Sequence, residues 1–185
     1  MNKLQLPLPS RRKLGFALAG AAVAGLAREA VAQTPAPAPS SERPPAPRSE
    51  FAFEILADIA PTLQLGEGPL GRRRMIPILG GVFEGPRIRG KLLPGGADRQ
   101  LLRKDGVTEL HAVYELQTDD GAIIGVENRV KVYAPPGEPR YAFSHIDLTA
   151  PDGPHAWLNR GVFVGTLVPL TTRPNGVRVT FYRLV

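Results

Sequence analysis

Short runs in which apolar and polar residues alternate dominate the chain after residue 50. An extended backbone over residues 51–59 would place Glu54 and Asp58 on one side, and on the other only apolar residues: Phe51, Phe53, Ile55, Ala57 and Ile59. A period of two is typical of a β-strand with one buried face. Further runs with strand character are separated by segments rich in glycine and proline: 74–79, 87–93, 99–103, 141–149, 162–170 and 177–185.

A β-hairpin is predicted over residues 109–133, around Asp119-Asp120-Gly121. A two-residue turn would place Tyr114 beside Glu127 and so mix apolar with charged side chains. A three-residue loop with its glycine in the left-handed region shifts the register by one residue and separates the two kinds of side chain. We therefore predict the three-residue loop, which leaves Asn128 as the one amide on the apolar face.

The succession of strands predicts an all-β fold. No segment after the N-terminal region has helical periodicity beyond a turn or two, and Asn175-Gly176 between two strand-like runs is a strong hairpin signal. Eight or more antiparallel strands with Gly/Pro corners are typical of an up-and-down barrel or a curled sandwich. Because closure removes unpaired sheet edges, we predict a small antiparallel up-and-down β-barrel.

Residues 1–32 have the order of a secretory signal peptide. Arg11-Arg12-Lys13 precedes the apolar run 17–27, and Ala30-Val31-Ala32 follows as a cleavage site. Paired arginines after Ser10 resemble a twin-arginine signal, although an ordinary secretory signal also tolerates them. The apolar run is too short to span a bilayer. We expect a periplasmic or secreted protein without a stable membrane anchor.

Residues 33–50 are rich in Pro, Ala and Ser and predict a disordered linker, so the barrel domain is expected over 51–185. The formal charge of +6 arises largely in the signal peptide, because the remaining residues carry 18 Lys/Arg and 16 Asp/Glu. Aromatic residues are scarce and are not interleaved with the basic ones. Nucleic-acid binding is therefore not expected.

Several ordered motifs between residues 51 and 185 resemble those of one family. They are Ile76-Pro77-Ile78 with Gly80-Gly81 and Phe83-Glu84-Gly85-Pro86, Gly95-Gly96-Ala97-Asp98, Asp105-Gly106, Tyr114 to Gly121, and Trp157-Leu158-Asn159. Together they are similar to an uncharacterised bacterial and fungal family, the domain-of-unknown-function family numbered 3237. The resemblance implies a small closed β-barrel and identifies no catalytic residue. The family often has Trp where this chain has Arg99.

Three residues are candidates for acid–base catalysis: Glu84, Asp98 and His145. Glu84 would suit proton transfer if it were partly buried, or it pairs with Arg87 or Arg89. Asp98 has the alternative of hydrogen-bonding the turn that it follows. His145 points the same way as Asp147 on a strand, so the carboxylate could orient the imidazole, or the pair is exposed and has no role.

Four residues are candidates for ligand binding: Asn128, Trp157, Asn159 and Arg87. A buried Asn128 must find hydrogen-bond partners, either in a strand irregularity or in a ligand. Trp157 and Asn159 precede a strand, near a barrel mouth, although tryptophan is more often a core residue than a binding platform. Arg87 is the candidate for an anionic group.

Neither a cofactor nor a metal ion is expected. The sequence has no dinucleotide-binding fingerprint, no zinc-protease motif and no serine-hydrolase elbow. Cysteine is absent, which excludes thiolate chemistry. A zinc site would require His145 to recruit His111 or His155 from other segments.

Three functions fit these observations. The first is a barrel that binds a small apolar or aromatic molecule at its mouth. The second is a cofactor-independent enzyme, an isomerase, cyclase or hydrolase, with a carboxylate or histidine as acid and base. The third is a structural or partner-binding protein whose Arg72-Arg73-Arg74 meets an acidic surface.

Overall fold

The computed structural model describes residues 44–185. The predicted signal peptide and the linker up to residue 43 lie outside the described residues. Within residues 44–185, no helix is long and apolar enough to cross a membrane. The elements are β1 (Ser49–Ile59), β2 (Leu63–Gly68), β3 (Gly71–Glu84), β4 (Arg89–Leu92), β5 (Ala97–Arg103), β6 (Thr108–Thr118), β7 (Ile123–Tyr133), β8 (Tyr141–Thr149), the 3₁₀-helix η1 (Ala156–Arg160), β9 (Phe163–Pro169) and β10 (Gly176–Leu184).

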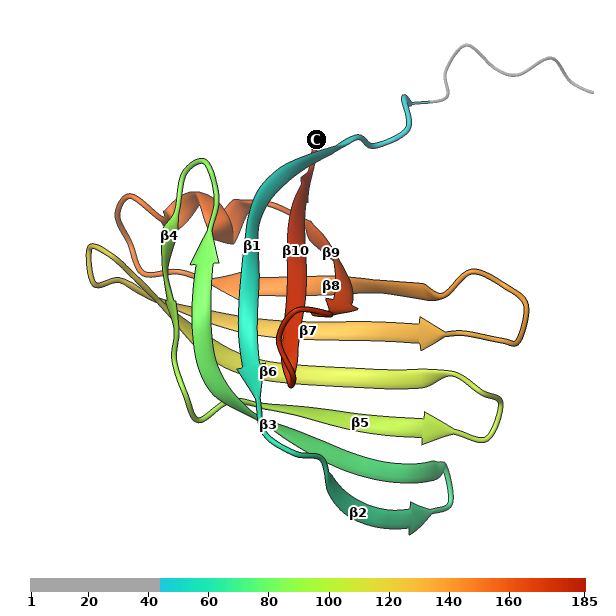
Figure 1. Cartoon of the computed structure of the whole chain (residues 1–185). Helices are drawn as coiled ribbons and strands as arrows, with labels where there is room; N and C mark the ends of the chain where they lie inside the picture. Colours follow the sequence, from blue (N-terminus) through green and yellow to red (C-terminus); the bar gives the residue numbers. More distant parts are fainter. Residues whose placement is uncertain (1–43) are drawn as a thin grey trace, which may run out of the picture. The chain divides into compact units, whose positions relative to one another are not determined.

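The strands form one closed antiparallel sheet, which confirms the predicted all-β barrel (Figure 1). The order of neighbours is β1-β10-β9-β8-β7-β6-β4-β3, and β3 pairs with β1 to close the ring. Strand β5 lies between β3 and β6 where β4 has ended, and β2 pairs with the first half of β3. Closure leaves no free edge along β1 from Glu54 onward, because β10 and β3 cover both of its sides there.

Strand β3 is longer than the sequence predicted, because it continues through Gly80-Gly81 instead of breaking there. Its first part pairs with β2 and β5, and its second part pairs with β1 and β4. The φ angles of +136° at Gly80 and +151° at Gly81 allow the bend between the two parts. A Cβ atom at Gly81 would lie 2.1 Å from the carbonyl oxygen of Leu56, so only glycine fits this close approach of β3 to β1.

Two local predictions are wrong. Gly66, Gly68 and Pro69 belong to one of the glycine- and proline-rich segments expected between strands, but Gly66 and Gly68 lie in β2 and the turn lies at Pro69-Leu70. Phe51, expected on the buried face of β1, is 47% exposed, whereas Ala52 is buried. A register shift between Phe51 and Phe53 in the pairing with β10 explains this, because an extra residue in one strand turns the preceding side chain to the other face.

The β6–β7 hairpin has the predicted register. Tyr114 pairs with Val126 and Ala112 pairs with Asn128. Gly121 in the loop has φ = +90°. The apolar face of the hairpin points into the barrel, where Asn128 is only 2% exposed.

One end of the barrel is filled by an aromatic core. Phe53 stacks on Phe181 at 4.2 Å between ring centroids and meets Phe83 edge-on at 5.8 Å. Leu158 of η1 belongs to the same buried cluster, and Trp157 packs against it. Figure 1 shows η1 beside the β3–β4 hairpin at this end. A ligand inside the barrel therefore has to lie farther along the interior.

Candidate ligand pocket inside the barrel

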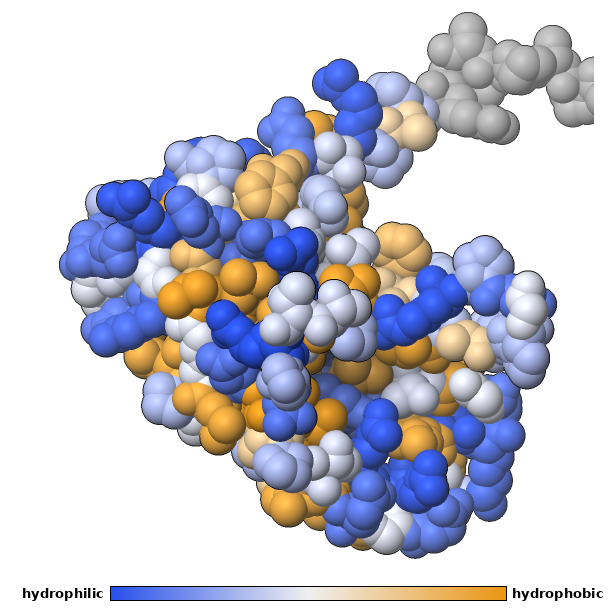
Figure 2. Space-filling model, viewed as in Figure 1, coloured by the Kyte–Doolittle hydropathy of each residue, from blue (hydrophilic) through white to orange (hydrophobic). Residues whose placement is uncertain are grey.

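A cavity of about 100 Å³ lies inside the barrel, and most of its wall is apolar. Ile59, Leu167 and Val177, near the ends of β1, β9 and β10, line it on one side. In Figure 1 strands β5 to β8 continue beyond β9 and β10, and Figure 2 shows the surface hollowed on this side. The cavity thus borders the end of the barrel opposite the aromatic core.

Four polar side chains line the cavity: Asp98, Gln100, Tyr114 and Asn128. They come from three neighbouring strands, because Asp98 pairs with Ala112 and Ala112 pairs with Asn128. The alanine is the smallest side chain in this row and leaves room between the carboxyl and the amide. Tyr114 is the next inward-facing residue on β6, since inward positions recur every second residue.

Three polar atoms in this wall are buried and make no hydrogen bond of ordinary length and angle among the described residues: Asp98 Oδ1, Tyr114 Oη and Asn128 Oδ1, although the Tyr114 hydroxyl and the Asn128 side chain lie near each other. A buried polar atom without a partner costs about 1–3 kcal/mol, and most native structures avoid it. Three such atoms around one apolar cavity provide hydrogen-bonding capacity that a bound molecule would satisfy.

Asp98 is held from behind by a short relay of side chains. Arg74 Nε donates to Gln100 Oε1 at 2.5 Å, and Gln100 Nε2 donates to Asp98 Oδ2 at 2.5 Å. Burial raises the pKa of Asp98, and the hydrogen bond from Gln100, the nearby backbone N–H of His111 and the charge of Arg74 oppose this only in part. The carboxyl therefore takes up a proton more readily than an exposed aspartate does.

Tyr114 stays protonated, because burial raises its pKa far above the ordinary value of 10.0 and the neighbouring Asn128 offsets this only in part. Its O–H can donate a hydrogen bond into the cavity. The Oδ1 atom of Asn128 can only accept one. The wall therefore offers a donor, an acceptor and a carboxyl group that changes role with its protonation state.

The three catalytic candidates occupy different places. Asp98 lies in β5 and faces the cavity, instead of hydrogen-bonding the preceding turn. Glu84, at the end of β3, is exposed, so the partial burial that would suit proton transfer is not present. His145 is on the outer face with its side chain 58% exposed, and its Nε2 is 3.7 Å from Asp147 Oδ1. The structure brings neither Glu84 nor His145 to the cavity.

The four candidates for ligand binding also lie in different parts of the barrel. Asn128 lines the cavity, whereas Trp157 packs against the aromatic core. The guanidinium group of Arg87 lies over the Trp157 ring, 4.2 Å from its centroid. Asn159 accepts from the backbone N–H of Ala150 at 2.7 Å and donates to the carbonyl of Ala150 at 2.9 Å. Its amide therefore fastens the β8–η1 connection. Trp157, Arg87 and Asn159 lie at the end of the barrel that the core closes.

Tyr114 and Gln100 were not among the candidates that the sequence suggested, and Arg74 was suggested only as part of a basic cluster that would meet an acidic partner. The signal for Gln100 was available, since it follows Asp98 by two residues in a strand and must share its face. Tyr114 was expected on the apolar face, and its hydroxyl becomes informative only when the opposing strands show that it meets no partner. Arg73 does not join Arg74, because alternation along β3 turns its side chain to the opposite, outer face.

The histidines do not assemble a metal site. Among residues 44–185, no group of three or more His, Cys, Asp or Glu side chains could hold an ion. His111 contacts Glu127 at 2.6 Å on the outer face, and His155 contacts Asp120 at 2.9 Å beside the β6–β7 loop.

Comparison with known proteins gives matches of the same architecture. A UPF0311 protein of Rhodopseudomonas palustris (strain TIE-1) is 46% identical over 84 residues, which are 45% of this chain and 55% of that protein. The chain thus aligns with about half the length of the curated relatives that it matches.

Solved structures align over nearly all of the barrel. A conserved protein of unknown function from Rhodopseudomonas palustris has a TM-score of 0.70 and 32% identity, and covers 77% of this chain and 100% of its own. A beta-barrel like protein from Acinetobacter baumannii has a TM-score of 0.69 and 28% identity, and covers 78% of this chain and 99% of its own. A family model for proteins of unknown function matches residues 47–184, and the chain therefore belongs to the DUF3237 family.

Proposed function

We propose that this protein binds a small, largely apolar or aromatic molecule that carries a hydroxyl or carbonyl group, in the pocket inside the barrel. The observation that carries the proposal is the set of three buried, unpartnered polar atoms in one apolar wall: Asp98 Oδ1, Tyr114 Oη and Asn128 Oδ1. A hydroxyl group would accept from Tyr114 and donate to Asn128. A carbonyl group would accept from Tyr114 or from the protonated Asp98.

The size of the cavity limits what enters. Its volume of about 100 Å³ is somewhat smaller than the roughly 150 Å³ of an apolar cavity that holds benzene. One ring, or a segment of similar size, is therefore the part of the ligand that the interior takes. The hollow beside β9 and β10 (Figure 2) leaves room for the remainder of a larger molecule.

The test compares phenol with benzene, which differ by one hydroxyl group. We expect phenol to raise the thermal unfolding midpoint of the full chain more than benzene does at equal concentration. In Asn128→Leu the advantage of phenol should disappear while the response to benzene remains. Asp147→Asn on the outer face is the control and should behave as the wild type. The proposal is wrong if neither probe binds, or if the preference for phenol survives in Asn128→Leu.

A second candidate, acid–base catalysis without a cofactor, is favoured by the raised pKa of Asp98 at the cavity wall. Ionised Asp98 would remove a proton next to a carbonyl group, while Tyr114 O–H donates to the oxygen on which charge develops. Deuterium incorporation into cyclohexanone in D₂O, followed by NMR, tests this chemistry. Asp98→Asn should abolish exchange and leave cyclohexanone binding in place. Exchange no faster than in buffer alone would rule out this activity.

We also propose export by the twin-arginine route, on the basis of Arg11-Arg12 before the apolar run 17–27. A fusion of residues 1–40 to green fluorescent protein tests it, because that reporter fluoresces in the periplasm only when it is exported already folded. Arg11→Lys with Arg12→Lys should retain the fluorescence in the cytoplasm. Export that persists in this variant would indicate the ordinary secretory route.

A further inference from the structure

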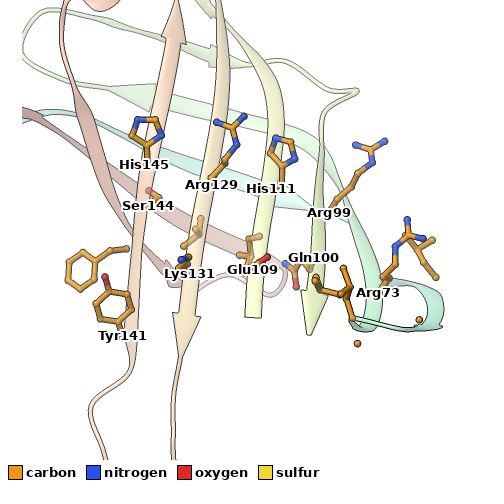
Figure 3. Close-up of a pocket in the computed structure, with 18 of the residues that line it drawn as sticks. Arg73, Arg99, Gln100, Glu109, His111, Arg129, Lys131, Tyr141, Ser144 and His145 are labelled. Atoms are coloured by element: carbon orange, nitrogen blue, oxygen red, sulfur yellow. The ribbon is translucent and has the colours of Figure 1, made fainter. Parts of the chain in front are cut away.

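A second concave surface lies on the outside of the barrel, on the opposite face of the strands that line the interior cavity. It is a groove of about 1040 Å³ across β2, β3, β5, β6, β7 and β8 (Figure 3). Figure 3 shows Arg99, His111, Arg129 and His145 in a row across four strands. The register confirms the row, since each of these residues is paired with the next.

On the side of β3 and β5, this groove has an excess of positive charge. Arg129 forms ion pairs with Glu127 and Asp147, and the lining residue Glu109 is paired with Arg103 at 2.7 Å. Arg73 and Arg99 are exposed, and neither has an acidic partner within residues 44–185.

The two arginines share one face and lie on neighbouring strands. Arg73 pairs with Leu101 and Met75 pairs with Arg99, so the arginines are diagonal neighbours. Diagonal positions are about 7–8 Å apart, which lets two guanidinium groups close on one anion from both sides. Like charges without acids between them repel each other, so this arrangement gains stability when an anion is bound.

Apolar side chains adjoin the arginine pair. Leu65 is the extra residue of a bulge in β2, between Gln64, which pairs with Arg74, and Gly66, which pairs with Arg73. A bulge re-aims a side chain, and here Leu65 lines the groove beside Arg73. Leu70, at the tip of the β2–β3 turn, is 73% exposed, and Leu101 lies opposite Arg73 and two residues from Arg99 on β5.

We infer that the outer groove is a second ligand site, for a small organic anion with an apolar body. Its carboxylate, sulfonate or phosphate group lies between Arg73 and Arg99, and its apolar part lies against Leu65, Leu70 and Leu101. This inference does not depend on the interior pocket, whose wall shares none of these five side chains.

The test uses two fluorescent probes with the same ring system. One is 8-anilinonaphthalene-1-sulfonate, and the other is N-phenyl-1-naphthylamine, which lacks the sulfonate. We expect the double variant Arg73→Gln/Arg99→Gln of the full chain to weaken binding of the sulfonate by about tenfold or more and to leave binding of the neutral probe unchanged. Arg48→Gln/Arg160→Gln removes the same charge at exposed positions elsewhere and should bind both probes as the wild type does.

Three results would overturn the inference. The first is equal loss of sulfonate binding in the two double variants, which would show a non-specific effect of net charge. The second is loss of sulfonate binding in Asn128→Leu, which would place the probe in the interior pocket. The third is a dimer, seen by sedimentation, that Arg73→Gln/Arg99→Gln dissociates, which would make the groove a contact between copies of the chain. Circular dichroism of each variant establishes that the fold is retained.

Discussion

Gln100 Nε2 donates to Asp98 Oδ2 at 2.5 Å, and this bond fixes which oxygen of Asp98 faces the cavity. The orientation of the Gln100 amide is set in turn by Arg74, whose Nε must meet the carbonyl oxygen of the amide and not its nitrogen. Asp98 Oδ1 is left without a partner among the described residues. A half-buried arginine thus positions an interior carboxyl group through one intermediate side chain.

The relay predicts the effect of removing the amide. The hydrogen bond from Gln100 lowers the pKa of Asp98, against the larger effect of burial. In Gln100→Leu this bond is lost, so the pKa of Asp98 should rise further above that in the wild type. The ¹³C chemical shift of the Asp98 carboxyl group, followed against pH, measures it. Gln117→Leu on β6 is the control, and an unchanged titration in Gln100→Leu would contradict the relay.

The titration of Asp98 also predicts how stability depends on pH. Because the pKa of Asp98 is raised in the folded protein above its ordinary value of 3.8, the folded state binds this proton more tightly than the unfolded chain. The contribution of Asp98 to stability is therefore full below about pH 4 and is lost as the pH rises through the folded pKa. Asp98→Asn removes this dependence. The free energy of unfolding of the variant minus that of the wild type should therefore increase as the pH rises.

Urea unfolding at several pH values between about 4 and 8 measures the difference. The hydrogen bond from Arg103 lowers the pKa of Asp105, and hydrogen bonds from Thr118 and His155 lower that of Asp120. Both carboxyls give the opposite slope, but they are present in both proteins and cancel in the difference. A constant difference between Asp98→Asn and the wild type would mean that Asp98 titrates as an exposed carboxyl does.

Much of the fold follows from the period of two in the sequence. The pairing of Ala112 with Asn128 was predictable because the register of the two-residue turn, one residue away, mixes charged with apolar side chains. Strand β2 was not, because nearly all of its residues are exposed and no burial pattern marks it. It is a strand because β3 provides its hydrogen bonds. Phe51 was misplaced because a bulge leaves no signal in the alternation itself.

The sequence predicted single residues of the site but not how they come together. Asn128 was expected on the inner face and is there, whereas the position of Asp98 after Gly95-Gly96 favoured a role in the turn over a role in catalysis. Whether a polar atom inside a barrel lacks a partner depends on which strands close around it. Tyr114 O–H is informative only because β5 and β7, which pair with β6 on its two sides, bring Asp98 and Asn128 to the same wall.

Substitution by alanine should cost different amounts of stability at two glycines. Gly95 has φ = +106°, and a Cβ there would meet no atom within 4 Å beyond its chain neighbours, so Gly95→Ala should cost about 1–3 kcal/mol from backbone strain alone. Gly81 has φ = +151°, and a Cβ there would meet the Leu56 carbonyl oxygen at 2.1 Å. Gly81→Ala should therefore destabilise more than Gly95→Ala, by separating β3 from β1. Urea unfolding of both variants measures this, and equal losses would show that β1 and β3 adjust without cost.

The hydrogen bonds of Asn159 predict that this residue has a structural role at the closed end of the barrel. Its side chain satisfies both the N–H and the carbonyl of Ala150, so Asn159→Ala leaves two partly buried backbone groups without partners. We expect a loss of about 1–3 kcal/mol in the free energy of unfolding for each group left buried and unpaired. Binding of phenol and of the anionic naphthalene probe should be unchanged in the folded variant. Asp152→Ala, an exposed position in the same connection, is the control and should leave stability nearly unaltered. A stable Asn159→Ala that no longer binds phenol would instead assign Asn159 to the ligand, because loss of binding without loss of stability is the mark of a contacting residue.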